Sequence, residues 1–335
     1  MTLETRLLGT LLLACVGCSS TTGGAGPHPD ASTDSNEGTS DSAPPRDARA
    51  SDTSPTDAKG TNPPPDAGPD TSLPGWKLTW SDEFEGANGS PPNPTYWTHD
   101  VGGDGWGNDE LEYYTDGAAN TYLENGSLVI VATSAGASAH SCANDGTPGP
   151  CMYTSGRIRT QPGTGFTGFA QAYGRFEARM KLPTGQGLWP AFWMLGTTIS
   201  TVNWPACGEI DVMENLGQAP TTVYGHLHMA ESSSGNYGPG TSYSLTSGSF
   251  SDDFHVFVIE WQKGEVDFFV DGAMYDSILE SSIPSDATWP FDGQPFFLVL
   301  NLAVGSKDSW PGAPNASTVF PAMVYVDYVR VYEKE

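Results

Sequence analysis

Basic residues are scarce in this sequence. Its 335 residues include 14 Lys and Arg against 40 Asp and Glu, which gives a formal net charge of −26. Such a charge repels the phosphates of nucleic acids and anionic membranes, and no run of Lys or Arg offers a local exception. We therefore expect no nucleic-acid partner and no direct membrane contact, and a polyanionic substrate is disfavoured for the same reason.

Long apolar segments are also lacking. The run from Leu7 to Val16 is too short to span a bilayer as a mature helix, so residues 1–18 are interpreted as an export signal. The ending VGCSS resembles a bacterial lipobox and predicts lipid attachment to Cys18, with Cys15 as a second candidate. We expect an exported protein, either a lipoprotein held at the outer membrane or cell envelope by its lipid alone, or a secreted one.

Cysteine is rare, with five residues in the chain. Cys142 and Cys151 bracket the turn-rich stretch ANDGTPGP, and in an exported protein this predicts a local disulfide. Cys207 would then be unpaired, and we interpret it as a small buried apolar side chain.

Apolar side chains are almost absent from residues 19–73, which carry nine acids against Arg46, Arg49 and Lys59. A segment of this composition cannot bury enough surface to offset the entropy of ordering it. We predict a disordered, acidic linker rich in Ser, Thr, Asp and Pro, extended between the N-terminal signal and the following domain.

Sustained helical periodicity is missing from residues 74–335. Short alternating runs such as GSLVIVAT, HVFVIEWQ and EVDFFVDG are separated by Gly, Pro, Asn or Asp, a pattern typical of strands and turns. The length exceeds that of a small barrel and fits a sandwich of two antiparallel sheets. We expect one all-β domain, monomeric, with no second domain after it.

The stretch CGEIDVMEN (207–215) places three acids in an otherwise apolar strand. Strand side chains alternate between faces, so Glu209 and Asp211 share a face whereas Glu214, five residues from Glu209, should point the other way. A β-bulge near Val212 and Met213 would absorb one residue and return Glu214 to the face of the other two acids.

Three interpretations of this acid cluster compete. A Ca²⁺ site would use carboxylates, but calcium loops carry Gly, Asn and Asp rather than Ile, Val and Met. The cluster could also be no more than a polar face of the sandwich. The third interpretation is a pair of glycosidase carboxyls, one attacking the anomeric carbon and the other protonating the leaving oxygen.

Tryptophans in turn-like surroundings favour the glycosidase interpretation. Flat indole rings stack on the C–H faces of sugars, although a single Trp is more often a core residue. Five Trp residues have Gly or Pro close by in the sequence: Trp106, Trp189, Trp193, Trp204 and Trp310.

A series of motifs in the same order resembles glycoside hydrolase family 16, and in particular its laminarinase-like endo-β-1,3-glucanases. The motifs are WSDEF (80–84), GWGNDELEYYT (105–115), YTSGRI (153–158), YGRFEARMKLPTGQGLWPAFWML (173–195), WPACGEIDVMEN (204–215), YGHLHM (224–229), FHVFVIEW (254–261), PFFLVLNLAVG (295–305), WPG (310–312) and VDYVRVY (326–332). The resemblance implies a β-jelly-roll sandwich with a concave glycan-binding cleft and no cofactor for catalysis.

The resemblance also implies roles for the acids. Glu209 would be the nucleophile and Glu214 the general acid/base, with Asp211 between them holding the nucleophile and keeping Glu214 protonated. The spacing E-x-D-x-x-E resembles the bulged branch of the family, which favours a retaining endo-acting hydrolase of β-1,3-glucan. The residues AVGSKDSWPG and the Cys142–Cys151 loop depart from the family pattern and affect subsite preference.

Further residues match family positions. Those expected to line the cleft are Asn108, Arg157, Trp189, Trp193 and His228, although His228 could equally be a hydrogen-bonded strand residue. A structural Ca²⁺ on the convex side would be bound by Glu83, a carbonyl near Gly126, and Asp327.

Other functions compatible with the same motifs stay open. A β-glucan transglycosylase would use the same residues, because water and a sugar hydroxyl compete for one intermediate. Mixed-linkage glucan, agarose or carrageenan could replace β-1,3-glucan, although the shortage of Lys and Arg disfavours sulfated galactans. A non-catalytic glucan-binding protein is disfavoured, because Glu209, Asp211 and Glu214 are all present.

Overall fold

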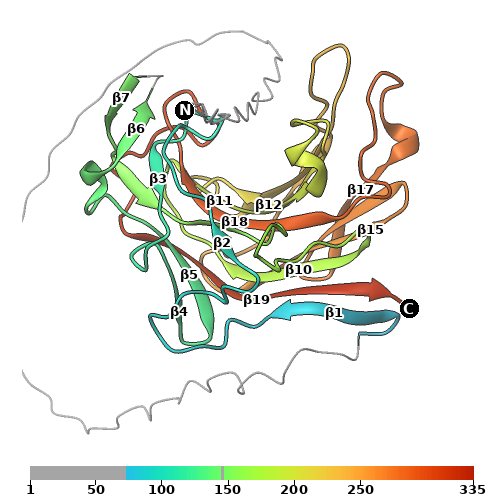
Figure 1. Ribbon diagram of the computed structural model, residues 1–335, viewed down its shortest axis with the longest axis horizontal. Coiled ribbons are helices and arrows are strands. Elements are labelled where there is room, and N and C mark those ends of the chain that lie inside the picture. Colours follow the sequence, from blue (N-terminus) through green and yellow to red (C-terminus); the bar gives the residue numbers. More distant parts are fainter. Residues whose placement is uncertain (1–72, 145–146) are drawn as a thin grey trace, which may run out of the picture. The chain divides into compact units, whose positions relative to one another are not determined.

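Strands make up nearly all the regular structure in a computed structural model of the chain, which describes residues 73–144 and 147–335 (Figure 1). The predicted signal, the lipid attachment at Cys18 and almost all of the predicted linker lie outside these residues. Helical segments in the described part are three short 3-10 turns, η1 (Ala137–Ala139), η2 (Thr197–Ser200) and η3 (Glu280–Ser282). None of them has the length and apolar character needed to cross a bilayer.

The first large sheet, here called the β10 sheet, is antiparallel and runs in the order β17-β16-β15-β10-β19-β5-β4, with β1 also paired to β19. Its strands are β1 (Trp76–Asp82), β4 (Thr121–Glu124), β5 (Ser127–Ala132), β10 (Gly174–Lys181), β15 (His255–Gln262), β16 (Glu265–Val270), β17 (Ala273–Leu279) and β19 (Ala322–Lys334).

The second, the β12 sheet, is also antiparallel and has the order β14-β13-β12-β11-β18-β9-β2. Its strands are β2 (Thr98–His99), β9 (Arg157–Arg159), β11 (Leu188–Gly196), β12 (Glu209–Asn215), β13 (Thr222–His228), β14 (Gly240–Ser244) and β18 (Phe296–Val304). Strands that are distant in sequence are therefore neighbours, and β12 lies between β11 and β13.

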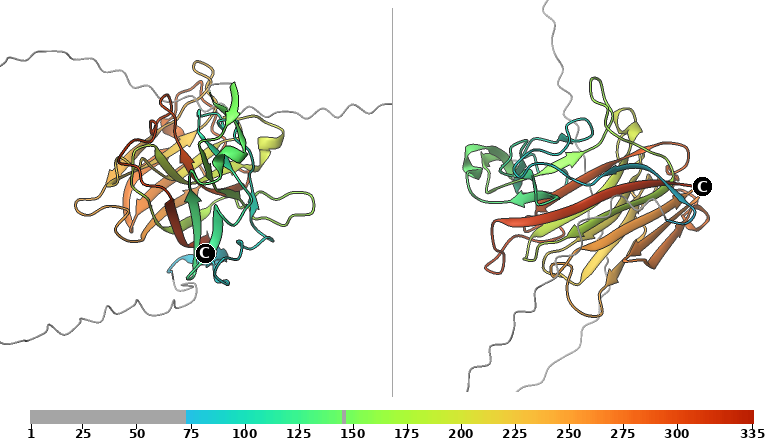
Figure 2. Two further views of the ribbon diagram at one scale, coloured as in Figure 1. Left: turned by 90° about the vertical axis from the view of Figure 1, so that its left-hand side faces the viewer. Right: turned by 90° about the horizontal axis from the view of Figure 1, so that it is seen from below.

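The two sheets pack face to face around one hydrophobic core (Figures 1 and 2). On β16 the alternation places Val266, Phe268 and Val270 inside, as expected for a strand with one buried face. Trp261 of the β10 sheet meets Phe296 of the β12 sheet edge to face, with ring centroids 5.2 Å apart. The all-β sandwich expected from the alternating sequence pattern is confirmed.

Two small strand pairs lie outside the large sheets. β3 (Glu112–Tyr114) pairs with β8 (Tyr153–Ser155) in parallel, a local exception to the antiparallel arrangement. β6 (Ser141–Asn144) and β7 (Thr147–Pro150) form a hairpin, and beside it a disulfide joins Cys142 and Cys151. Cys207 is a free thiol, fully buried among apolar side chains.

Candidate active site

A β-bulge in β12 brings the three acids to one face. Asp211 pairs with His226 of β13 and Glu214 with Tyr224, so three residues of β12 advance against two of β13. The pairing of β12 with β11 shifts at the same place, where Val212 has no partner. The bulge predicted from the parity of the acids is therefore confirmed.

The bulge satisfies two demands of the same strand. Val212 and Met213, which are neighbours in the chain, both belong to the core between the sheets, together with Ile210. An unbulged strand would send Val212 to the core and Met213 to the opposite face. Because the extra residue absorbs one step of the alternation, Glu214 returns to the face of Glu209 and Asp211. This face of the β12 sheet is called the cleft face below.

Glu214 is fixed by two ring nitrogens. Its Oε1 accepts a hydrogen bond of 3.1 Å from the indole Nε1 of Trp189 on β11. Its Oε2 lies 2.8 Å from Nδ1 of His226 on β13. The carboxyl is therefore held from both neighbouring strands while its backbone stays in β12.

The other two acids have free acceptor atoms. Glu209 and Asp211 are 5% and 4% exposed, and Glu209 Oε2 has no hydrogen-bond partner in the part of the chain that the structure describes. Asp211 Oδ2 lies 3.3 Å from His228 Nε2 without forming a hydrogen bond. Buried carboxylate oxygens are normally hydrogen-bonded, and these two oxygens have no such partner among the described residues.

Spacing and burial raise the pKa of two of the acids. Oxygens of Glu209 and Asp211 lie within 4.8 Å of each other, and the same limit holds for Asp211 and Glu214. Burial and the charge of Asp211 raise the pKa of Glu209 to about 8; Glu214 adds to this shift, whereas His228 and Arg157 oppose it. Burial and the charge of Glu214 raise the pKa of Asp211 well above its usual range. Glu209 and Asp211 therefore lose their protons at a higher pH than exposed carboxyls do.

His226 is tuned by the same carboxyls. Burial alone would lower its pKa, but the hydrogen bond and charge of Glu214, together with the charge of Asp211, outweigh burial and raise it. A group whose pKa moves toward neutrality beside a candidate acid can share that acid's proton. His226 was not among the predicted site residues. The alternation in YGHLH could have identified it, since His226 and His228 must share a face.

Arg157 is held between two aromatic rings at the β9 side of the cleft face. Its guanidinium lies 4.7 Å from the ring centroid of Trp106 and 4.8 Å from that of Trp193. Asp100 completes its surroundings with an ion pair of 3.0 Å. Stacking and charge pairing fix the side chain, and its charge acts on Glu209.

Asn108 is oriented by an acid outside the catalytic cluster. Its Nδ2 donates to Oε1 of Glu110 over 3.1 Å, while Glu110 Oε2 accepts from the hydroxyl of Tyr114 over 3.0 Å. The network continues through Asn301, which donates to Tyr114 and accepts from the indole of Trp193. The amide oxygen of Asn108 is therefore the atom left for a hydroxyl donor.

Three aromatic side chains, Trp189, Tyr224 and Trp310, pack together beside Glu214. Trp310 is 43% exposed, and its ring centroid lies 5.6 Å from that of Trp189 and 4.8 Å from that of Tyr224. An exposed indole packed edge to face on two rings is held rigidly enough to serve as a stacking platform. Tyr224 was not predicted as a site residue.

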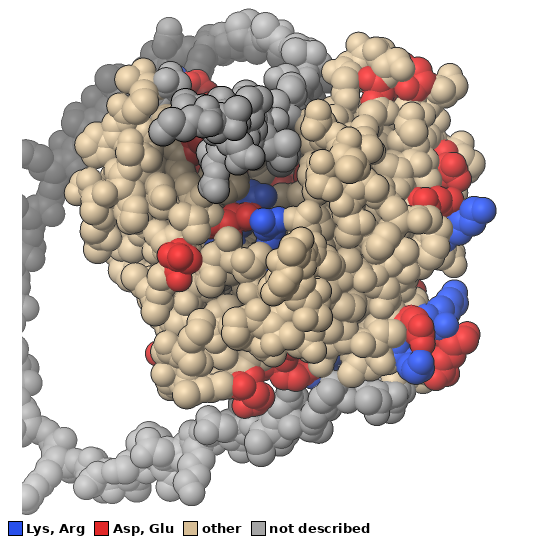
Figure 3. Space-filling view, in the orientation of Figure 1, with Lys and Arg blue, Asp and Glu red and all other residues tan. Residues whose placement is uncertain are grey.

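One face of the described domain has a hollow that contains charged side chains (Figure 3). In Figure 3, acidic and basic atoms meet in a hollow of the surface, while most of the visible face of the described domain carries neither charge. The site described above, with Trp106, Trp189 and Trp310 and a few polar groups, suits a neutral ligand with many hydroxyls.

The residues expected to bind calcium are paired with arginines. Both carboxylate oxygens of Glu83 accept hydrogen bonds from Arg330, at 3.0 and 2.7 Å. Asp327 pairs with Arg179 at 2.7 Å. The charge of each acid is already compensated by a guanidinium, so this set of residues fits a cation poorly. Calcium binding stays a prediction.

A two-sheet jelly roll with two glutamates and an aspartate on one aromatic-lined face defines a glycoside hydrolase. The family model of glycosyl hydrolases family 16 matches residues 114–329, and the chain belongs to this family. Its reaction needs no cofactor.

Relatives agree with this assignment. A β-glucanase of Rhodothermus marinus is 39% identical over 268 residues, which cover 77% of this chain and 86% of the relative. The laminarinase catalytic domain of Thermotoga maritima has 42% identity and a TM-score of 0.66, covering 78% of this chain and 99% of that one. An endo-β-1,3-glucanase of Pyrococcus furiosus has 45% identity and a TM-score of 0.66, covering 78% and 95%.

The raised pKa of Glu209 predicts a stability effect that depends on pH. Between the ordinary pKa of 4.5 and the folded value of about 8, the folded protein binds more protons at this group than the unfolded chain. The contribution of Glu209 to stability is therefore lost as pH rises through this window. We expect Glu209→Gln to raise Tm relative to wild type by roughly 5 °C at about pH 9, and by much less at about pH 5.

Thermal unfolding of both proteins across this pH range checks the prediction. Glu260→Gln, on β15 of the β10 sheet, is the control and should show a difference in Tm that does not grow with pH. A Glu209→Gln difference that is equally flat would contradict the raised pKa.

Proposed function

We propose that the protein is a retaining endo-β-1,3-glucanase that acts by double displacement. The observation that carries the proposal is the bulge in β12, which sets Glu209, Asp211 and Glu214 in a row on the cleft face. Retaining enzymes need two carboxyls roughly 5–5.5 Å apart beside the scissile bond. An oxygen of each glutamate lies within 4.8 Å of an oxygen of Asp211, and these distances are compatible with that separation.

In the first step the ionised Glu209 attacks the anomeric carbon and forms a glycosyl ester. Its unpaired Oε2 is the attacking atom, and Glu214 gives its proton to the oxygen of the departing sugar. Trp189 and His226 hold the Glu214 carboxyl while it loses this proton, and the indole hydrogen bond stabilises the resulting negative charge.

In the second step water attacks the ester on the opposite side. Glu214, now ionised, takes a proton from that water, and the bond between the anomeric carbon and Glu209 breaks. The first proton leaves with the departing sugar, and the proton taken from water restores the acid form of Glu214 for the next turnover. Asp211 lies near both glutamates, and its charge opposes the loss of a proton from either of them. Two inversions restore the β configuration in the product.

The substrate is proposed to be a neutral β-1,3-glucan of the laminarin type. Arg157, the guanidinium beside Glu209, already has its charge paired with Asp100. A sulfated chain would therefore meet a cluster of acids, beside which the charge of Arg157 is already compensated. Trp106 and Trp193 enclose Arg157 on the β9 side, and on the other side the exposed Trp310, packed on Trp189, offers a ring to a sugar chain.

Transglycosylation is the second candidate activity. The aromatic group of Trp189, Tyr224 and Trp310 lies beside Glu214, where the departing sugar leaves and an acceptor enters. An acceptor held there would compete with water for the glycosyl ester.

The test is hydrolysis of laminarin, followed by proton NMR of the products within the first minutes. We expect oligosaccharides of mixed length whose new reducing ends are β anomers, which then equilibrate. New ends that are α would overturn the retaining mechanism, and cleavage of agarose or carrageenan in preference to laminarin would overturn the substrate. Products longer than the substrate would assign transglycosylation.

Export is proposed from the N-terminal sequence. Residues 1–18 would direct the chain out of the cytoplasm, and a lipid on Cys18 would hold the monomeric enzyme at the cell surface. Mass spectrometry of the mature N-terminus checks this: a lipid mass on Cys18 is expected, and an unmodified N-terminus further along the chain would indicate ordinary secretion.

A further inference from the structure

A hairpin closed by a disulfide contacts the loop of residues 102–111, which carries Trp106. The hairpin consists of β6 and β7, and the Cys142–Cys151 bond closes it. The two cysteines are 2% and 4% exposed and form a small apolar cluster with Ala137, against which Tyr113 packs. This cluster is separate from the core between the two large sheets.

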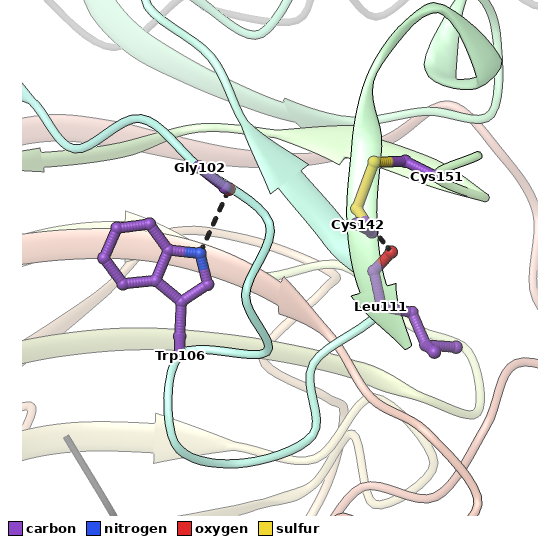
Figure 4. The surroundings of a disulfide bond; sticks show 5 residues. All are labelled: Gly102, Trp106, Leu111, Cys142 and Cys151. Atoms are coloured by element: carbon purple, nitrogen blue, oxygen red, sulfur yellow. Dashed lines mark hydrogen bonds between the residues drawn. A yellow bond between two sulfur atoms is a disulfide. The ribbon is translucent and has the colours of Figure 1, made fainter. Parts of the chain in front are cut away.

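The hairpin contacts the loop of residues 102–111 at several points (Figure 4). Cys142 Sγ lies 3.9 Å from the carbonyl oxygen of Leu111, and the backbone N–H of Ala143 donates to Gly103 over 2.7 Å. A Cβ atom on Gly103 would lie 2.5 Å from Cys142 Sγ. The sulfur therefore rests on the loop backbone itself, at a residue whose lack of a side chain makes the contact possible.

This loop carries its own conformational strain. Trp106 and Asp109 have φ angles of +49° and +56°, in the left-handed region that residues other than glycine rarely adopt. Such conformations persist where surrounding contacts fix them. Within the loop, the indole Nε1 of Trp106 donates a hydrogen bond of 3.2 Å to the carbonyl oxygen of Gly102 (Figure 4).

Trp106 connects the loop to the catalytic acids. Its ring packs edge to face on Tyr114, at 5.3 Å, and lies against the guanidinium of Arg157. Arg157 in turn stacks on Trp193 and acts electrostatically on Glu209. A displacement of the loop would therefore change the wall of the cleft at its β9 end without touching the two glutamates directly.

We propose that Cys142 and Cys151 are positioning residues for glucan binding: the closed hairpin supports the loop so that Trp106 stays stacked on Arg157 before the sugar chain arrives. An isolated two-stranded hairpin is marginal in water, so without the bond β6 and β7 support the loop poorly. Binding would then have to order the loop as well, at a cost in affinity. The inference deepens the proposed function and rests on it.

The test uses the full chain with Cys142→Ser and Cys151→Ser combined. We expect KM for laminarin to rise roughly tenfold while kcat changes by less than about twofold, because one aromatic wall is no longer ordered in advance. A short aryl β-glucoside, which does not reach the β9 end, should keep both constants. Equal losses of kcat on both substrates, or an unchanged KM for laminarin in the folded variant, would overturn the proposal.

Two comparisons separate this role from a general loss of stability. Trp106→Ala should raise KM for laminarin by a similar factor, and the combined variant should be no worse than either, because both changes remove the same wall. Effects on KM that multiply instead would show that the disulfide acts elsewhere. A reductant should reproduce the effect in wild type and change nothing in the cysteine variant, which excludes a contribution from Cys207.

Hydrogen exchange of the free protein tests the inference without any glucan. The amides of Asn108 and Glu110, both hydrogen-bonded to the carbonyl of Gly105, should exchange faster in the cysteine variant. Unchanged exchange would overturn the proposal whatever the substrate is. Faster exchange in a protein that does not cleave laminarin would instead show that the substrate assignment alone is wrong.

Discussion

Glu209→Ala is expected to reduce kcat on laminarin by roughly 10⁴-fold, because the attacking carboxylate is removed and no other group can form the glycosyl ester. The fold should persist, since the change removes a buried carboxyl whose Oε2 has no hydrogen-bond partner in residues 73–144 and 147–335. Near-ultraviolet circular dichroism and kinetics on the purified variant measure the two quantities. Glu260→Ala, on the other sheet, is the matched control and should retain wild-type turnover.

The stereochemistry of rescue gives a sharper result than the loss of activity. Azide, a small anion, can occupy the space of the missing Glu209 carboxylate and attack an activated aryl β-glucoside directly. One displacement inverts the configuration, so the product should be an α-glycosyl azide. No rescue, or a β-glycosyl azide, would contradict the assignment of Glu209 as the nucleophile.

Glu214→Ala is expected to have a different profile. Turnover of laminarin should fall by roughly 10²- to 10⁴-fold, because the leaving sugar oxygen no longer receives a proton. Formation of the ester from a dinitrophenyl β-glucoside should be nearly unaffected, since that leaving group departs without protonation. A burst of dinitrophenol followed by a slow steady state measures this difference.

Azide again distinguishes the role. In Glu214→Ala it should attack the glycosyl ester formed with Glu209, and two displacements give a β-glycosyl azide. The same product configuration from both variants would mean that the roles of the two glutamates are not those proposed. A β-glycosyl azide from Glu209→Ala together with an α-glycosyl azide from Glu214→Ala would exchange the two roles.

The position of the acids could be predicted because it depends on local rules. The alternation of a strand fixes which side chains share a face, and the apolar residues Ile210, Val212 and Met213 show which face is buried. The odd separation of Glu209 and Glu214 then requires an extra residue between them. Few other features of the site follow from adjacent residues of a single strand in this way.

The contacts that tune the acids could not be predicted in the same way. The hydrogen bond from His226 to Glu214 depends on the register between β12 and β13, and the stack of Trp106, Arg157 and Trp193 joins three segments far apart in the chain. No local pattern encodes these distances. The arginine partners of Glu83 and Asp327 likewise arise from neighbouring strands, so the calcium set inferred from motif positions could not anticipate them.

The extra residue in β12 also determines how a deletion in this strand would affect the positions of the acids. Removing Val212 would leave Glu, Asp and Glu at alternate positions of a regular strand, which points all three to one side without any bulge. Deleting one residue from a buried strand usually moves every later side chain to the opposite face of the sheet. Here the three carboxyls would stay on one face, and the interior would lose only a valine side chain. A strand with Val212 and a strand without it can thus present the same three carboxyls. The longer strand adds one apolar side chain to the interior.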